Sequence, residues 1–139
     1  MLEHGMIAPV LALVAWTCVM WFWMYATRIP AIQKANIDMA KLSRTGAPLT
    51  LPPEIARVAD NYNHLHEQPT IFYALALAAH VAGAADDLNV GLAWAYVGVR
   101  VAHSFIQATK NVIPVRFAVF TLGSLVLMAL LVRTAWLVL

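Results

Sequence analysis

Arg100 and His103 lie three residues apart in an apolar stretch, residues 90–108, that is long enough to cross a bilayer. An arginine at the centre of a spanning helix costs about 2.5 to 3.5 kcal/mol on insertion scales, so it is retained where a partner or a polar cavity receives it. Because arginine is always charged and presents a planar set of donors, this position favours the binding of an anion. The partner that the sequence offers is Glu67, at the start of the preceding apolar segment.

Two polar stripes emerge when these residues are placed on helices, because residues three or four apart share a helix face. The first stripe contains Asp60, Asn63 or His64, and Glu67. The second contains Tyr96, Arg100, His103, Gln107 and Lys110. In a hairpin of the two helices, Glu67 lies level with Gln107, and Arg100 lies about 10 Å deeper. The stripes predict a polar, arginine-bearing cavity suited to an anionic ligand.

The same residues also have simpler explanations. Arg100 and Glu67 could form a buried pair that fixes the helix register, and His103 could bond a backbone carbonyl. His64 and His66 point to different helix faces, so these histidines do not form a zinc site and no metal is predicted. The sequence contains no Ser-His-Asp arrangement and no phosphate-binding glycine loop.

The composition places these residues in a membrane protein. Hydrophobic residues make up 62% of the 139 residues and charged residues 12%, and the mean hydropathy is +0.72. A chain of this size cannot hide so much apolar surface in one small soluble core. Four segments have the length and composition of spanning helices: 6–27, 68–85, 90–108 and 117–139. We expect an all-α, integral membrane four-helix bundle.

The helices are predicted over about 6–28, 53–85, 89–109 and 115–138, in a single domain of residues 1–139. Pro52 and Pro53 suit the start of the second helix, because proline is tolerated in a first helical turn. Pro69 should kink that helix, since proline removes a backbone donor and clashes one turn back.

Basic residues gather in two of the three connections between these helices. The first and third connections hold Arg28, Lys34, Lys41, Arg44, Arg57, Lys110 and Arg116. The second connection carries Asp86 and Asp87 instead. The positive-inside rule therefore places both basic connections in the cytoplasm and both termini outside it. Topology and anionic lipid explain these charges, so membrane lipid is the expected partner and nucleic acid is not.

The order and spacing of three short motifs resemble the MAPEG family (membrane-associated proteins in eicosanoid and glutathione metabolism). The motifs are Glu67-x-Pro69, Arg100-Val-Ala-His103 and Pro114-Val-Arg116. The resemblance covers nearly the whole chain and is strongest over residues 57–123. It implies a homotrimer of four-helix subunits, and here we expect a multi-pass protein of a bacterial inner membrane.

The resemblance also implies a glutathione site between subunits on the cytoplasmic side. Arg116 would be the catalytic residue that stabilises the glutathione thiolate, because a nearby cation lowers a thiol pKa. The residues carried over to glutathione binding are Arg57, Asn63, Glu67, Arg100, His103, Gln107 and Arg28.

Two departures from the enzymes of this family keep two functions open. Gln107 stands where the prostaglandin-synthase branch has a tyrosine, and Phe117 and Phe120 replace hydroxyl residues of that branch. One hypothesis is a glutathione-dependent transferase or peroxidase that acts on lipophilic electrophiles. The other is a non-catalytic membrane scaffold or accessory subunit that binds lipid or a larger membrane complex.

Overall fold

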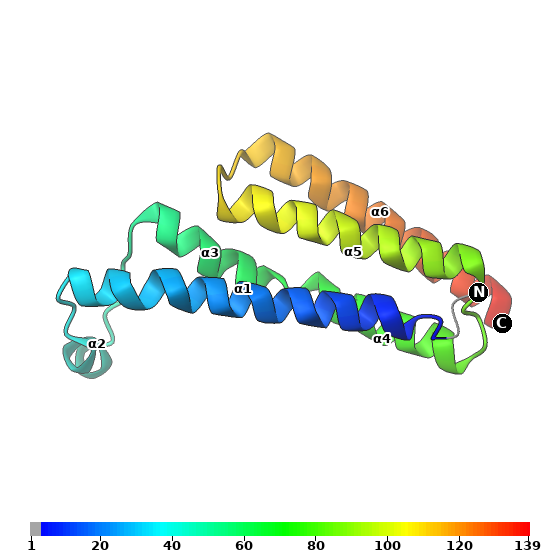
Figure 1. The fold of residues 1–139 in the computed structure, drawn as a ribbon, viewed down its shortest axis with the longest axis horizontal. Helices are drawn as coiled ribbons and strands as arrows, with labels where there is room; N and C mark the ends of the chain where they lie inside the picture. Colours follow the sequence, from blue (N-terminus) through cyan, green and yellow to red (C-terminus); the bar gives the residue numbers. More distant parts are fainter. Residues whose placement is uncertain (1–3) are drawn as a thin grey trace.

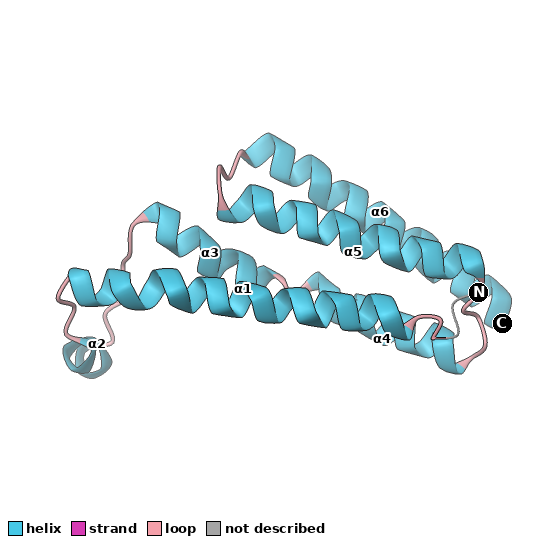
Figure 2. Ribbon diagram, viewed as in Figure 1, coloured by secondary structure: helices cyan, strands magenta, loops and turns pink. Residues whose placement is uncertain are grey.

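The computed structural model describes residues 4–139 and is helical throughout, without a strand in that part of the chain (Figures 1 and 2). The six helices are α1 (Ile7–Lys34), α2 (Met39–Thr45), α3 (Pro53–His64), α4 (Gln68–Val81), α5 (Asp87–Ala108) and α6 (Ile113–Val138). The predicted all-α class is confirmed. The sequence predicts four helices; α2 is added in the first connection, and the second predicted helix is divided into α3 and α4.

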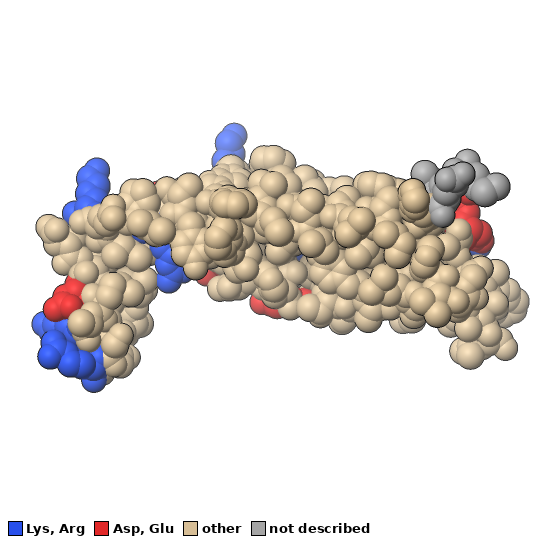
Figure 3. Space-filling model, turned by 60° about the horizontal axis from the view of Figure 1, so that its bottom comes forward, with Lys and Arg blue, Asp and Glu red and all other residues tan. Residues whose placement is uncertain are grey.

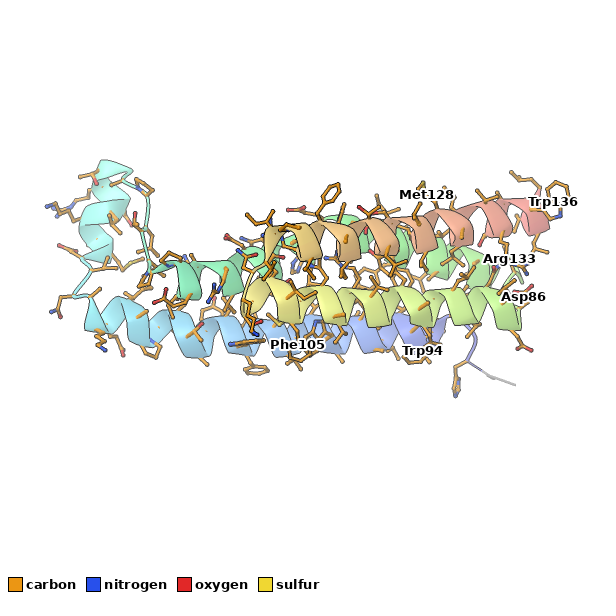
Figure 4. The ribbon with its side chains drawn as sticks, turned by 90° about the horizontal axis from the view of Figure 1, so that it is seen from above. Asp86, Trp94, Phe105, Met128, Arg133 and Trp136 are labelled. Atoms are coloured by element: carbon orange, nitrogen blue, oxygen red, sulfur yellow. The ribbon has the colours of Figure 1, made fainter. Side chains whose placement is uncertain are left out.

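Two of the described helices, α1 and α6, are long and apolar enough to cross a membrane. With 28 residues, α1 is about 42 Å long at 1.5 Å per residue. Most of the surface of α6 is apolar and exposed, including Met128 and Trp136 on its outer side (Figure 4). That surface suits contact with lipid. Spanning by α4 and α5 stays a prediction.

The long helices run side by side, and α3 and α4 follow one another along α1 (Figure 1). Helix α5 packs on α6 over its length. The two come close at Gly123, where an added Cβ would lie 3.2 Å from Val99 Cγ1. On the other side, the Trp16 Nε1–H of α1 donates to Ser104 Oγ of α5 at 3.0 Å. Helix α5 therefore lies between α1 and α6 and carries its polar stripe in the interior.

The division between α3 and α4 falls at residues 65–67, just before Pro69. Pro69 lies in the first turn of α4, where its missing N–H leaves no intrahelical bond unmade. A continuous helix would require that N–H and would bring the proline ring against the preceding turn. The helix therefore stops and restarts where the sequence predicts a kink, and Glu67 lies at the restart.

A chain of hydrogen bonds links α4, α5 and α6 beyond this division. The Tyr96 hydroxyl donates to Gln68 Oε1 at 3.2 Å, and Gln68 Nε2 donates to Ser124 Oγ at 2.8 Å. The Tyr96 ring stacks on Phe72 with centroids 4.6 Å apart. Polar groups in an apolar interior are costly unless they bond one another, so these three side chains fix the relative register of three helices.

A second polar cluster joins the start of α5 to the end of α6. Asn89 is fully buried, and its amide donates to the Ala84 carbonyl at 2.7 Å. Arg133 of α6 donates through Nε to Asn89 Oδ1 at 2.9 Å and also bonds the Asp86 carboxylate (Figure 4). Asp86 in turn accepts from the Asn89 backbone N–H at 2.8 Å and caps α5. Asn89 is the centre of this cluster.

Replacing Asn89 with alanine should destabilise the protein by about 1 to 3 kcal/mol, because the Ala84 carbonyl and the Arg133 guanidinium both lose a bond. Thermal unfolding in detergent measures the loss. The exposed neighbour Asp87, changed to asparagine, is the matched control and should cost less than about 1 kcal/mol. Equal melting losses for Asn89→Ala and Asp87→Asn would contradict the central role of Asn89.

Candidate functional site

A polar cavity of about 420 Å³ opens between α3, α5 and the start of α6. Its lining residues are Asp60, Asn63, His64, Glu67, His103, Gln107 and Arg116. Five of the eight residues that the sequence singles out for a site are therefore gathered here: Asn63, Glu67, His103, Gln107 and Arg116. Arg28, Arg57 and Arg100 do not line the cavity.

The helices set the positions of these groups. His103 and Gln107 are four residues apart on α5 and share its inner face. Asn63 lies in the last turn of α3, and Glu67 lies in the break before α4. Arg116 enters from the first turn of α6. Three chain segments that are separate in sequence therefore meet at one cavity.

The expected pair of Glu67 with Arg100 is not formed within one chain. The Glu67 carboxylate accepts from His64 Nδ1–H at 2.9 Å, and its side chain is 67% exposed. Arg100 is 1% exposed, and none of its three guanidinium nitrogens has a hydrogen-bond partner. Within one chain, the arginine side chain does not bridge the difference in depth of about 10 Å that the helical register predicts between the two residues. Glu67 is instead held by the last residue of α3.

Several polar atoms at the cavity are buried without a partner. His103 is 2% exposed and Gln107 is 8% exposed, and His103 Nδ1 and Gln107 Oε1 make no hydrogen bond. Buried polar groups are normally bonded to protein, water or ligand, and each unpaired one costs about 1 to 3 kcal/mol. Both residues line the cavity, and these two atoms have no partner within the chain.

Arg116 is held by a residue that the sequence analysis does not single out. Arg116 NH1 donates to Asn111 Oδ1 at 2.7 Å. Asn111 has a φ of +51°, a left-handed conformation that asparagine tolerates better than most residues. Its backbone N–H bonds the Ile106 carbonyl at 2.7 Å and ends α5. An asparagine after a helical pattern signals a helix end, but nothing in the sequence shows that its side chain points to Arg116.

A smaller, more apolar chamber of about 220 Å³ adjoins the polar cavity. It shares His64, His103 and Arg116 with that cavity, and its remaining lining residues are Ile113, Phe117 and Phe120. The His64 and His103 rings lie 4.9 Å apart, centroid to centroid. A polar and an aromatic compartment therefore meet at one arginine and two histidines.

The remaining predicted residues lie elsewhere. Arg57 is half-buried on α3 with an unpaired Nε, and Arg28 is half-buried on α1. Within residues 4–139, no three His, Cys, Asp or Glu side chains gather in a way that could hold a metal ion.

The profile of the MAPEG family matches residues 6–136 of the chain. The chain belongs to the MAPEG family. The resemblance drawn from the three short motifs is thus confirmed, and with two membrane-length apolar helices the chain is a membrane protein of that family. No curated protein and no solved structure matches it.

The surroundings of His64 at this MAPEG cavity change its pKa. Burial lowers the pKa of His64 from its ordinary 6.5, the bond to Glu67 opposes that effect, and the positive charge of Arg100 lowers the pKa further. Below pH 6.5 the unfolded chain therefore takes up this proton more readily than the folded one, and His64 makes folding less favourable as the pH falls.

We expect the His64 imidazole signals in a nuclear magnetic resonance titration to shift with a midpoint below pH 6.5. Glu67→Gln should lower the midpoint further, because it removes the hydrogen-bonded anion that stabilises the imidazolium. Asp60→Asn changes another cavity carboxylate that does not bond His64, so it is the control. An unchanged or raised midpoint in Glu67→Gln would show that the two side chains are not paired.

Proposed function

We propose that this MAPEG protein binds glutathione in the cavity between α3, α5 and α6 and acts as a glutathione-dependent transferase or peroxidase on lipophilic electrophiles. The observation that carries the proposal is the meeting of Arg116 with the unpaired polar atoms of His103 and Gln107 in one cavity of about 420 Å³. Cavities of about 300 to 1,000 Å³ are typical of small-molecule sites.

The cavity, like this tripeptide, carries charges of both signs. Glutathione carries two carboxylates and one ammonium group at neutral pH. The lining offers a cation in Arg116 and two anions in Asp60 and Glu67. His103 and Gln107 add polar side chains whose Nδ1 and Oε1 atoms have no partner within the chain. A ligand with charges of both signs uses these groups better than a simple anion does.

The chain's own residues would perform three tasks. When bound, glutathione supplies a thiol as the nucleophile. Arg116 lowers the pKa of a thiol placed beside it, because a neighbouring cation favours the thiolate. Asn111 holds the Arg116 guanidinium at its place. The adjoining chamber, with Phe117 and Phe120 in its lining, receives an apolar electrophile or peroxide from the bilayer.

The second candidate function is a non-catalytic membrane scaffold or accessory subunit. Gln107 favours it, because an amide in the place of a tyrosine hydroxyl cannot donate a phenolic proton to a reacting group. In that case Arg116 would hold an anionic lipid headgroup, and the exposed apolar face of α6 would contact lipid or a larger membrane complex.

The distribution of charge supports an orientation in the membrane. The start of α1 and the end of α6 lie at the end of the molecule away from α2 (Figure 1). Basic residues gather toward the α2 end (Figure 3). We therefore place the α2 end and the cavity on the cytoplasmic side of a bacterial inner membrane, and the termini outside.

A homotrimer would complete the cavity. Arg100 is buried within a single chain, whereas Asp60, Asn63 and Glu67 are exposed at the cavity. A neighbouring copy would shield these polar groups from lipid.

Native mass spectrometry of the detergent-solubilised protein should give three times the chain mass of 15.3 kDa. The trimer should persist in Arg116→Leu, because Arg116 bonds within its own chain. A stable monomer across detergents would contradict the assembly.

Glutathione bound beside Arg116 should ionise below its free thiol pKa, so adding protein at neutral pH should raise the ultraviolet absorbance of the thiolate. Arg116→Leu should abolish the signal. Lys110→Leu removes an exposed cation just before α6 that does not line the cavity, so it should leave the signal unchanged.

Calorimetry on the same three proteins separates binding from ionisation. If glutathione binding releases or absorbs heat but gives no thiolate signal, the cavity would still be a glutathione site, and Arg116 would have no catalytic role. If neither binding heat nor a thiolate signal is observed, and the amount of co-purified lipid decreases in Arg116→Leu, the scaffold function would be supported and the enzyme function rejected.

A further inference from the structure

Helix α2, residues Met39–Thr45, is a short helix without a packing partner. None of its seven residues is buried, and it makes no substantial contact with the other helices. Isolated helices shorter than about 12 to 15 residues are marginal in water, because packing of an amphipathic face supplies most helical stability in proteins. The surface that stabilises α2 is therefore outside this chain.

The sequence nevertheless defines the two ends of this helix. Asp38 caps the start, where its carboxylate accepts from the Lys41 backbone N–H at 3.1 Å. Gly46 ends it in a left-handed conformation, with φ of +69° and its N–H bonded to the Leu42 carbonyl at 2.9 Å. Such caps favour a helix but do not replace packing. Residues 38–46 are thus prepared to be helical against a surface.

The side chains of α2 separate into two faces. Met39 and Leu42 are three residues apart and share one face. Lys41 and Arg44 have the same spacing and lie on the opposite face. Lys34, in the last turn of α1, is a third cation in the segment that leads to α2. Figure 3 shows Lys and Arg gathered at this end, on a body with few charges over the rest of that face.

The position of α2 fits the surface of the bilayer. The length of α1, about 42 Å, equals the thickness of a bilayer with both headgroup layers, about 40 to 45 Å. The end of α1 then lies at the headgroup level, and residues 35–38 connect it directly to α2. Helix α2 lies across the direction of α1 (Figure 1), so it runs along the membrane plane when α1 spans.

We propose that α2 is an interfacial helix that binds the anionic headgroups of the bilayer in which α1 is embedded. Lys34, Lys41 and Arg44 supply the charge that complements phosphate groups, and Met39 and Leu42 supply the apolar face. Each cation near an anionic surface raises the affinity about fivefold. This site is separate from the cavity and does not depend on glutathione binding.

The test uses the full-length protein in vesicles, with a solvent-sensitive fluorophore on one cysteine. Cys18 is the single cysteine of the chain and is first replaced by alanine. Leu42→Cys then places the label on the apolar face, and Ala40→Cys places it almost opposite. Vesicles of phosphatidylcholine alone are compared with vesicles that also contain phosphatidylglycerol, and acrylamide measures exposure to water.

With phosphatidylglycerol, the label at position 42 should shift to shorter wavelength and be quenched several-fold less than the label at position 40. Lys41→Glu with Arg44→Glu should abolish this lipid dependence, because it reverses two charges. Lys110→Glu changes another exposed cation outside α2 and should preserve it. All variants should have the same melting temperature, since α2 has no packing partner within the chain.

Two results would overturn the proposal. Protection of position 42 that is the same in both vesicle types and in detergent, and that increases with protein concentration, would assign α2 to a second copy of the chain. Equal, strong quenching at positions 40 and 42 in phosphatidylglycerol vesicles would place α2 in water.

Discussion

The missing N–H of Pro69 determines how the polar residues of this protein are arranged. The missing N–H and the proline ring disfavour a continuous helix at that position, and α3 ends at His64 while α4 begins at Gln68. Glu67 is consequently exposed at the break and bonds His64. Gln68, immediately after it, faces inward and bonds Tyr96 and Ser124. Two consecutive residues before Pro69 therefore lie in different surroundings. Glu67 faces the polar cavity, and Gln68 belongs to the hydrogen-bonded interior.

Much of the fold follows from patterns that depend on one segment at a time. Hydropathy and length identify α1 and α6 as membrane-length helices, and helical spacing brings His103 and Gln107 to one face. The gathering of Asn63 and Glu67 with them agrees with the two predicted stripes. These predictions succeed because the period of a helix and the thickness of a bilayer are fixed quantities.

What the sequence does not predict depends on contacts between segments or on small changes of backbone direction. The pair of Glu67 with Arg100 does not form within the chain, because Glu67 bonds His64 at the break between α3 and α4. Asn111 was missed because its role requires both a left-handed backbone and a nearby Arg116 side chain. Helix α2 was not predicted, because a segment of seven residues is too short to show a helical period in the sequence. The unpaired state of Arg100 is likewise a property of the packed interior, not of its local sequence.

Helix α6 carries an arginine near each end, and each is bonded to a residue outside the helix. Arg116 bonds Asn111 in the turn after α5, and Arg133 bonds Asn89 in the first turns of α5. Their spacing along the axis is about 25 Å at 1.5 Å per residue. Two attachments so far apart oppose both sliding and rotation of α6 against α5. The height of the Arg116 guanidinium relative to the cavity is therefore also set from the far end of α6, since sliding α6 along α5 would break the Arg133–Asn89 bond as well.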